Sequence, residues 1–243
     1  MTVRLYLEDG TLREAVGVVV AASSEGVELD RTPFYPRAGG QPGDAGVLRW
    51  DGGTMDVSEA RKGEGGTVLH VPVPGAAVPA VGMVVRSEVD WLRRFGHMRM
   101  HTAMHLLCAL LPGASVTGGQ VGAERSRLDF DLAVAPDKDD LDAGLAALVA
   151  ADHVVTVEWV DEAVLDANPG LVRTLSVRPP RGSGRVRLVR IGAEGALVDV
   201  QPCGGTHVAR TGQIGGLRVL KVENKGRQNR RISIGLTPAG LEG

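Results

Sequence analysis

Residues 93–107, RRFGHMRMHTAMHLL, decide the fold because they join a helical apolar pattern to a pair of histidines. His101 and His105 are four residues apart, so a helix places both imidazoles on one face, one turn apart. Two neutral imidazoles in that arrangement can hold a zinc ion at about 2.0–2.1 Å each. An N-capping aspartate before the stretch and a Pro-Gly pair after it predict a helix from residue 91 to residue 111.

A second pair of candidate ligands lies further on, in residues 202–207, PCGGTH. Cys203 and His207 are also four residues apart, and the two glycines between them can take positive φ in a tight loop. Together with the helical histidines they make a set of three imidazoles and one thiolate, which suits zinc. The residue after His101 is Thr102 rather than Glu, so the helix does not have the pattern of a metalloprotease.

Spacing alone leaves two interpretations of this zinc site open. Four protein ligands normally close the coordination sphere, which favours a structural zinc. A catalytic zinc needs an open position, which is available if one of the four ligands binds weakly or is displaced by water or substrate.

Composition indicates a globular protein of ordinary make-up. The chain has 243 residues, of which 43% are hydrophobic and 23% charged, enough for one large domain or two modest ones. Its two cysteines do not suggest a disulfide framework, and Cys108 is expected to be a small buried hydrophobe. The chain shows neither a signal-sequence pattern nor a run of eighteen apolar residues, so we expect a cytoplasmic protein with no membrane partner.

The charge is unevenly distributed along the chain. The net charge is −2, but residues 171–243 contain 13 Lys and Arg against 4 Asp and Glu, whereas the rest of the chain is acidic. A basic C-terminal third is typical of a surface that contacts a phosphate backbone. The alternative is a solvated face whose charge is neutralised by the acidic part of the fold.

The pattern of short strands predicts an α+β protein with two domains. Up to residue 88, runs rich in β-branched residues alternate with Gly and Pro and predict a small β-barrel, with strands at residues 2–8, 15–22, 27–30, 47–50, 67–73 and 83–89. Residues 31–46 hold three prolines and four glycines and are expected to be extended and rich in turns. The predicted domains are an N-terminal barrel at 1–88 and a zinc-containing α+β domain at 89–243.

The second predicted domain packs helices on an antiparallel sheet. Besides the histidine helix, helices are expected at 136–150 and 161–167, and strands at 126–130, 154–159, 185–191, 195–200, 217–222 and 231–236. Residues 117–121 are expected to form a turn. Residues 185–190 alternate basic and apolar side chains, which predicts a half-buried strand with a basic face.

An ordered series of motifs resembles a known family. The motifs are TPFYP at 32–36, GGQPGDAG at 39–46, DWLRR at 90–94, HTAMHLL at 101–107, LDF at 128–130, CGGTH at 203–207 and ENKGRQNRR at 223–231. They resemble the editing region of alanyl-tRNA synthetase and, more closely, the freestanding AlaX trans-editing proteins of medium length. The resemblance runs from about Leu5 to Leu236. Arg37 and Ala38 depart from it, because the family has an acidic residue and a glycine there.

The resemblance implies hydrolysis of the ester that joins a wrong amino acid to alanine tRNA, namely Ser-tRNA(Ala) and possibly Gly-tRNA(Ala). A site of alanine size cannot exclude glycine by bulk, and it rejects an added hydroxyl only about a hundredfold, so a second site is needed. The implied zinc ligands are His101, His105, Cys203 and His207. The implied selectivity residues are Thr32, whose hydroxyl would recognise serine, and Gln120 as a pocket amide. The implied contacts to the acceptor stem are Arg93, Arg94, Lys225, Arg227, Arg230 and Arg231.

Two other functions remain open at this point. One is a non-catalytic tRNA-binding module with a structural zinc, and the other is a zinc hydrolase of a small ester or amide. The full ligand set with Thr32 favours the editing enzyme over the first, and the basic C-terminal third favours it over the second.

Overall fold

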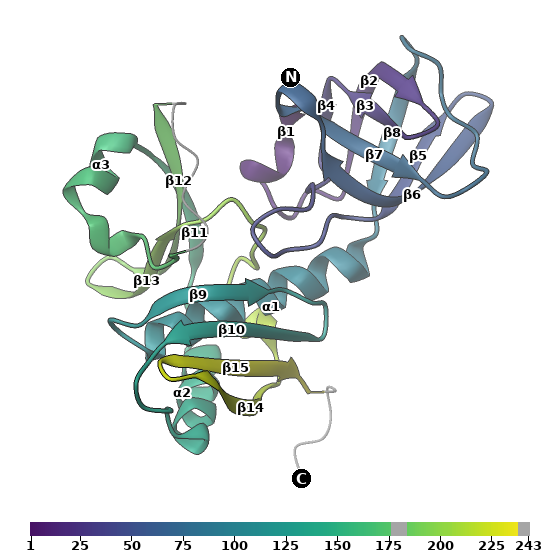
Figure 1. Ribbon diagram of the computed structural model, residues 1–243. Helices are drawn as coiled ribbons and strands as arrows, with labels where there is room; N and C mark the ends of the chain where they lie inside the picture. Colours follow the sequence, from purple (N-terminus) through teal and green to yellow (C-terminus); the bar gives the residue numbers. More distant parts are fainter. Residues whose placement is uncertain (176–183, 238–243) are drawn as a thin grey trace. The chain divides into compact units, whose positions relative to one another are not determined.

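A computed structural model describes residues 1–175 and 184–237, which fall into two compact units (Figure 1). The first unit is residues 1–97 and the second is residues 98–243. The division lies inside helix α1 (Trp91–Leu110), so this one helix contributes residues to both units. The domain limits expected from the sequence, 1–88 and 89–243, stay a prediction.

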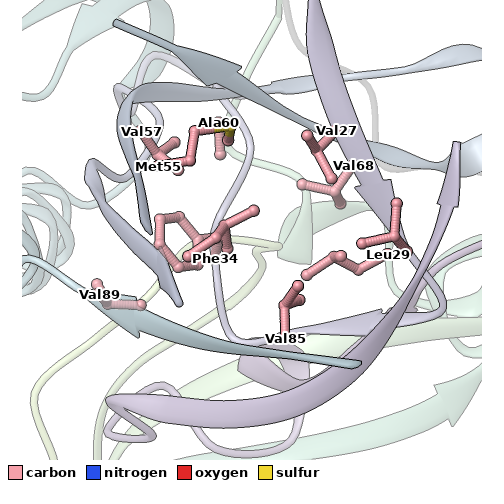
Figure 2. Close-up of a cluster of buried hydrophobic side chains, with 11 residues drawn as sticks. Val27, Leu29, Phe34, Met55, Val57, Ala60, Val68, Val85 and Val89 are labelled. Atoms are coloured by element: carbon pink, nitrogen blue, oxygen red, sulfur yellow. The ribbon is translucent and has the colours of Figure 1, made fainter. Parts of the chain in front are cut away.

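The first unit is built on a closed antiparallel barrel with the strand order β2-β3-β7-β6-β5-β8. The strands are β2 (Glu14–Ser23), β3 (Gly26–Leu29), β5 (Gly46–Trp50), β6 (Gly53–Lys62), β7 (Val68–Pro72) and β8 (Val84–Val89). Their inward side chains, among them Val27, Leu29, Met55 and Val85, fill the barrel together with Phe34 from the segment between β3 and β5, as Figure 2 shows. The predicted N-terminal barrel is confirmed.

Two parts of this unit differ from the expectation. Residues 2–8 do not form one strand: a short β1 (Val3–Arg4) pairs in parallel with β4 (Arg31–Thr32), and a 3-10 turn (Leu5–Leu7) follows. That turn buries Tyr6 edge-on against Tyr35, with ring centroids 5.2 Å apart. Strand β6 was not expected, although buried Met55 and Val57 alternate with exposed neighbours along it.

The second unit holds the rest of α1, helices α2 (Lys138–Ala150) and α3 (Glu162–Ala167), and two antiparallel sheets. One sheet has the order β14-β15-β10-β9, with β14 (Leu217–Gly226), β15 (Asn229–Leu236), β10 (Arg125–Asp131) and β9 (Ser115–Gln120). The other has the order β11-β12-β13, with β11 (Val155–Asp161), β12 (Arg185–Ala193) and β13 (Ala196–Pro202). Short 3-10 helices lie at Pro169–Leu171 and Thr211–Ile214 in this unit and at Glu64–Gly66 in the first unit. The α+β class is confirmed.

The sequence-based expectation for residues 117–121 is wrong, because most of them belong to strand β9. Two consecutive glycines suggested a turn, but Gly118 and Gly119 pair with Asp129 and Leu128 of β10. A Cβ atom added at Gly119 would lie 2.8 Å from the side chain of Leu128, so the glycine allows close packing across the strands. Tertiary packing therefore decides the conformation here.

Candidate metal centre

Helix α1 carries two imidazoles on one of its faces, in the part of the helix that belongs to the second unit. The helix begins as expected, since the Arg93 N–H donates to the Asp90 carboxylate at 3.1 Å. His101 and His105 lie on successive turns, with ring centroids 5.6 Å apart, and both are largely buried. Cys108, one turn further along, is also buried, and burial raises the pKa of its thiol to about 12. Cys108 is thus a small apolar residue at neutral pH, as predicted.

The loop after β13 brings the second pair of donors to the first. Its carbonyls are held by Arg187 of β12, which donates to the Cys203 oxygen at 2.6 Å and to the Gly205 oxygen at 3.0 Å. Arg187 is buried, so the expectation that it lies on a basic outer face is wrong. A guanidinium offers several donors in a rigid fork, which lets one side chain fix two carbonyls of a Gly-rich turn.

The four predicted ligands converge in one cluster. The donor atoms of His101, His105, Cys203 and His207 all lie within 4.8 Å of one another. The Cys203 Sγ is 3.6 Å from His101 Nε2 and 3.3 Å from His207 Nε2. Tetrahedral zinc with ordinary bond lengths puts a thiolate and an imidazole nitrogen roughly 3.5 Å apart. The cluster could therefore hold a metal ion, and its donor set fits zinc.

Hydrogen bonds set the tautomers of two imidazoles. The Thr102 hydroxyl donates to the Met98 carbonyl at 2.9 Å, so its oxygen must accept from His207 Nδ1, 3.2 Å away. His105 Nδ1 lies 2.7 Å from the carboxylate of Asp199, which it donates to. In both rings Nδ1 carries a proton, so Nε2 is the nitrogen that would bind a cation.

The ionisation of the cluster also suits a metal. Burial raises the pKa of Cys203, but the interaction with His101 and the hydrogen bonds from His101 and His105 outweigh it and hold that pKa well below its usual value. The Gly205 N–H donates to the sulfur at 3.4 Å, which further favours the thiolate. Burial lowers the pKa of His207 to about 3, so that ring is neutral. Burial lowers the pKa of His105, but the hydrogen bonds with Asp199 and Cys203 outweigh it and raise that pKa from 6.5 to about 10. Zinc binds a thiolate and neutral imidazoles, so His105 gives up a proton when the metal binds.

In the first unit, Thr32 is fully buried and its hydroxyl is oriented by His70. His70 Nδ1 lies 2.9 Å from the Val27 carbonyl, which can only accept, so the ring proton is on Nδ1. His70 Nε2 must then accept from the Thr32 hydroxyl, 2.8 Å away. The Thr32 oxygen in turn accepts from the Phe34 N–H at 3.1 Å. A further partner of Thr32 would therefore have to donate to its oxygen.

Arg93 and Arg94, the two residues of α1 predicted to contact nucleic acid, differ in burial and in their partners. Arg94 is fully buried in the first unit, where it pairs with Asp44 and donates to the carbonyls of Gly10 and Pro33 at 2.8 Å and 2.6 Å. Arg93 is half-buried and donates to the Gly43 carbonyl at 3.3 Å. Arg94 thus stabilises the interior of the first unit, a role that the sequence did not indicate.

The basic residues of the β14–β15 hairpin also fall into two groups, those with internal partners and those that are exposed. Arg231 makes two bonds with Asp129, at 2.7 Å and 2.8 Å, and Arg230 is buried, donating to the carbonyls of Gly226 and Ala133. Arg227 is exposed, and Lys225 makes a long contact of 3.4 Å with Glu223. In the same unit, Gln120 is exposed at the end of β9 and accepts from Arg127 at 3.3 Å.

Sequence reasoning missed the side chains that support the ligands. Asp199, Gln201 and Cys203 occur at every second position, and the first two are buried on one face of β13. Alternation along a strand predicts that these three side chains point the same way, so the signal was present. Thr102 and Arg187 gave no comparable signal, because their partners lie far away in the sequence.

Two family models and several known proteins match this chain. Residues 186–233 match the family model described as the threonyl and alanyl tRNA synthetase second additional domain, and residues 8–93 match that of class II (A) tRNA synthetases. The alanine–tRNA ligase of Pyrobaculum arsenaticum is 34% identical over 91% of this chain, which corresponds to 25% of the ligase. Within the described residues, we find no helix both long and apolar enough to cross a membrane.

The most extensive similarity is to freestanding editing proteins. The alanyl-tRNA editing protein AlaX-M of Methanosarcina acetivorans is 37% identical over 96% of this chain and 98% of its own length. The protein of the same name from Saccharolobus solfataricus is 32% identical over 98% of this chain and 100% of its own length. The chain therefore belongs to the AlaX-M family of alanyl-tRNA editing proteins, as its motifs predicted.

Proposed function

We propose that this protein is a zinc-dependent trans-editing hydrolase that deacylates Ser-tRNA(Ala) and, as a second substrate, Gly-tRNA(Ala), while sparing Ala-tRNA(Ala). The observation that carries the proposal is the convergence of three imidazoles and one thiolate within 4.8 Å in a chain of the AlaX-M family. The relatives are named for editing of alanyl-tRNA, which supports tRNA(Ala) as the partner.

The zinc ligands in this proposal are His101, His105, Cys203 and His207. Two of the imidazoles have their Nδ1 protons engaged by Thr102 and Asp199, and the thiol has a lowered pKa, so the donors are prepared for a cation. When bound, zinc supplies Lewis-acid polarisation of an ester carbonyl or activation of a water molecule. Cys203 retains some exposure, which favours access to this side of the cluster.

Selectivity is assigned to Thr32. Because its hydroxyl proton is directed to His70, its oxygen offers an acceptor to the hydroxyl of a serine. A site built to hydrogen-bond a hydroxyl disfavours an analogue that lacks it, by as much as about 10⁴–10⁵ in favourable cases. Alanine, which has a methyl group there, would lose this bond. Gln120 is retained as a second polar group for the substrate.

The contacts to the tRNA backbone are assigned to exposed or half-buried cations. Arg227 and Lys225 at the hairpin, with Arg93 on α1, are the candidates we favour. Arg94, Arg230 and Arg231 are occupied by internal partners, so we assign them first to the support of the fold.

The experiment that tests this function is deacylation of three purified substrates, Ser-, Gly- and Ala-tRNA(Ala), with tRNA binding measured in parallel. Rapid release of serine, together with retention of alanine, is the expected result. The alternative, a tRNA-binding module with a structural zinc, is favoured by the number of protein ligands, since four normally close the coordination sphere. Binding of tRNA and zinc without release of any amino acid would establish that alternative and contradict the proposal.

A further inference from the structure

Behind the predicted ligands, a buried carboxylate is held against the cluster. Asp199 of β13 is 6% exposed and accepts from His105 Nδ1 at 2.7 Å. Its other contacts come from Gln201, whose amide nitrogen donates to both Asp199 oxygens, at 2.9 Å and 3.0 Å. Gln201 is also 6% exposed, so the pair forms part of the interior of the second unit.

Burial of a carboxylate is costly unless hydrogen bonds and an opposite charge compensate it. The hydrogen bonds come from His105 and Gln201, and an imidazole that binds zinc through Nε2 is neutral, so in the loaded site neither donor carries a positive charge. A divalent cation at the cluster would supply it. Zinc carries two positive charges, the Cys203 thiolate cancels one, and the Asp199 carboxylate cancels the other.

We infer that Asp199 is a positioning residue for the metal, which orients His105 through its Nδ1 proton and neutralises the charge of the loaded site, with Gln201 holding the carboxylate in place. The inference rests on the proposed zinc site. Carboxylates that accept from a ligating histidine fix its tautomer and raise its basicity, and their removal typically weakens metal binding 10- to 100-fold.

The alternation of side chains along β13 explains why Asp199, Gln201 and Cys203 lie together. Residues at every second position of a strand lie on one face, so Asp199 and Gln201 precede Cys203 on the same side of β13 and its continuation. His105 approaches from α1, far away in the sequence, and the 2.7 Å bond joins the two ligand-bearing segments. Asp199 therefore couples the orientation of a helical ligand to the strand that leads to the loop ligands.

The test is the zinc dissociation constant of the purified full chain, measured by competition with a chelator, for wild type and three variants. Asp199→Asn keeps an acceptor for His105 but removes the charge, and we expect about tenfold weaker binding. Asp199→Ala removes both, and we expect about a hundredfold weaker binding. Glu158→Gln is the matched control, because it removes one negative charge from β11 of the same sheet at a partly exposed pair with Arg190. Its dissociation constant should equal that of wild type.

Cobalt substitution provides a second readout that a purely structural role would not change. In Asp199→Asn, the d–d bands of the cobalt protein should shift because His105 is less well held, while the thiolate band from Cys203 persists. Asp199→Asn is nearly isosteric, so it keeps the test decisive if Asp199→Ala does not fold. Wild-type affinity and a wild-type cobalt spectrum in Asp199→Asn would overturn the inference and leave the zinc site intact. Failure of the wild-type chain itself to bind zinc would overturn the zinc site as well.

Discussion

The Arg94 guanidinium forms an ion pair with the Asp44 carboxylate inside the first unit, and both side chains are fully buried. Arg94 Nε is 2.9 Å from each Asp44 oxygen, and the Tyr35 N–H donates to the same carboxylate at 2.5 Å. The remaining donors of Arg94 reach the carbonyls of Gly10 and Pro33. The pair thereby ties the start of α1 to the turn-rich segment that follows Thr32.

We expect Asp44→Ala to lower the free energy of unfolding by about 3–5 kcal/mol, because it leaves a buried guanidinium without its counter-charge. Urea unfolding of the full chain measures this change. Glu14→Ala is the control, since it breaks an exposed ion pair with Arg86 and should leave stability nearly unchanged. Equal, small effects of both variants would show that the Arg94–Asp44 pair does not support the fold.

Stability should depend on pH through His70. Burial lowers the pKa of His70 from 6.5 to about 4, so between these values the unfolded chain binds a proton that the folded protein does not. Its contribution is therefore fully present above pH 6.5 and is lost as the pH falls toward 4. Between pH 7 and pH 4, wild type should lose about 3 kcal/mol more than His70→Gln, which cannot ionise. Parallel pH profiles for the two proteins would contradict this assignment.

Thr32→Val should abolish the discrimination between serine and alanine with little change in side-chain volume. The variant loses the oxygen that accepts from Phe34 and from the proposed substrate hydroxyl, so release of serine should fall at least about 100-fold. Thr32→Ser keeps the hydroxyl and should retain most of the activity. The measurement is kcat/KM for Ser-tRNA(Ala), with unfolding curves to confirm that both variants are folded. Selectivity of the Val variant equal to wild type would remove Thr32 from the proposed site.

The hairpin cations should contribute to the salt dependence of tRNA binding. Replacing Arg227 and Lys225 by Gln should weaken binding and reduce the slope of log K against log salt by about 1 for each phosphate that the protein no longer neutralises. Lys138→Gln removes a charge from α2, where it pairs with Asp142, and serves as the control. An unchanged slope in the double variant would exclude the hairpin from the interface.

Much of this site could be predicted because its strongest signals are local. The His101/His105 spacing and the Cys203/His207 spacing each lie within a few residues, and the structure brings both pairs into one cluster. The supporting groups could not be assigned in the same way. Arg94 looked like a phosphate ligand because its partner Asp44 is fifty residues away, and only the fold brings them together.

Local sequence patterns also predicted only part of the fold. The barrel was predictable from strands and turn residues, but β6 was missed where charged side chains interrupt its apolar positions. Strand β9 was mistaken for a turn, because Gly118 and Gly119 have no side chains to show a strand pattern and are held by pairing with β10. Asp199 and Gln201 were overlooked because a polar residue in a strand usually indicates the solvent face, whereas here it faces the metal ligands.

The most direct test of the account is whether release of serine from Ser-tRNA(Ala) requires a metal at this cluster. Wild-type protein stripped by a chelator should lose activity and recover it when zinc is restored, whereas Cys203→Ala should stay inactive with zinc, since it lacks the thiolate of the set. Serine release at the wild-type rate by the stripped protein and by Cys203→Ala would contradict the central claim that the His101, His105, Cys203 and His207 cluster carries the reaction.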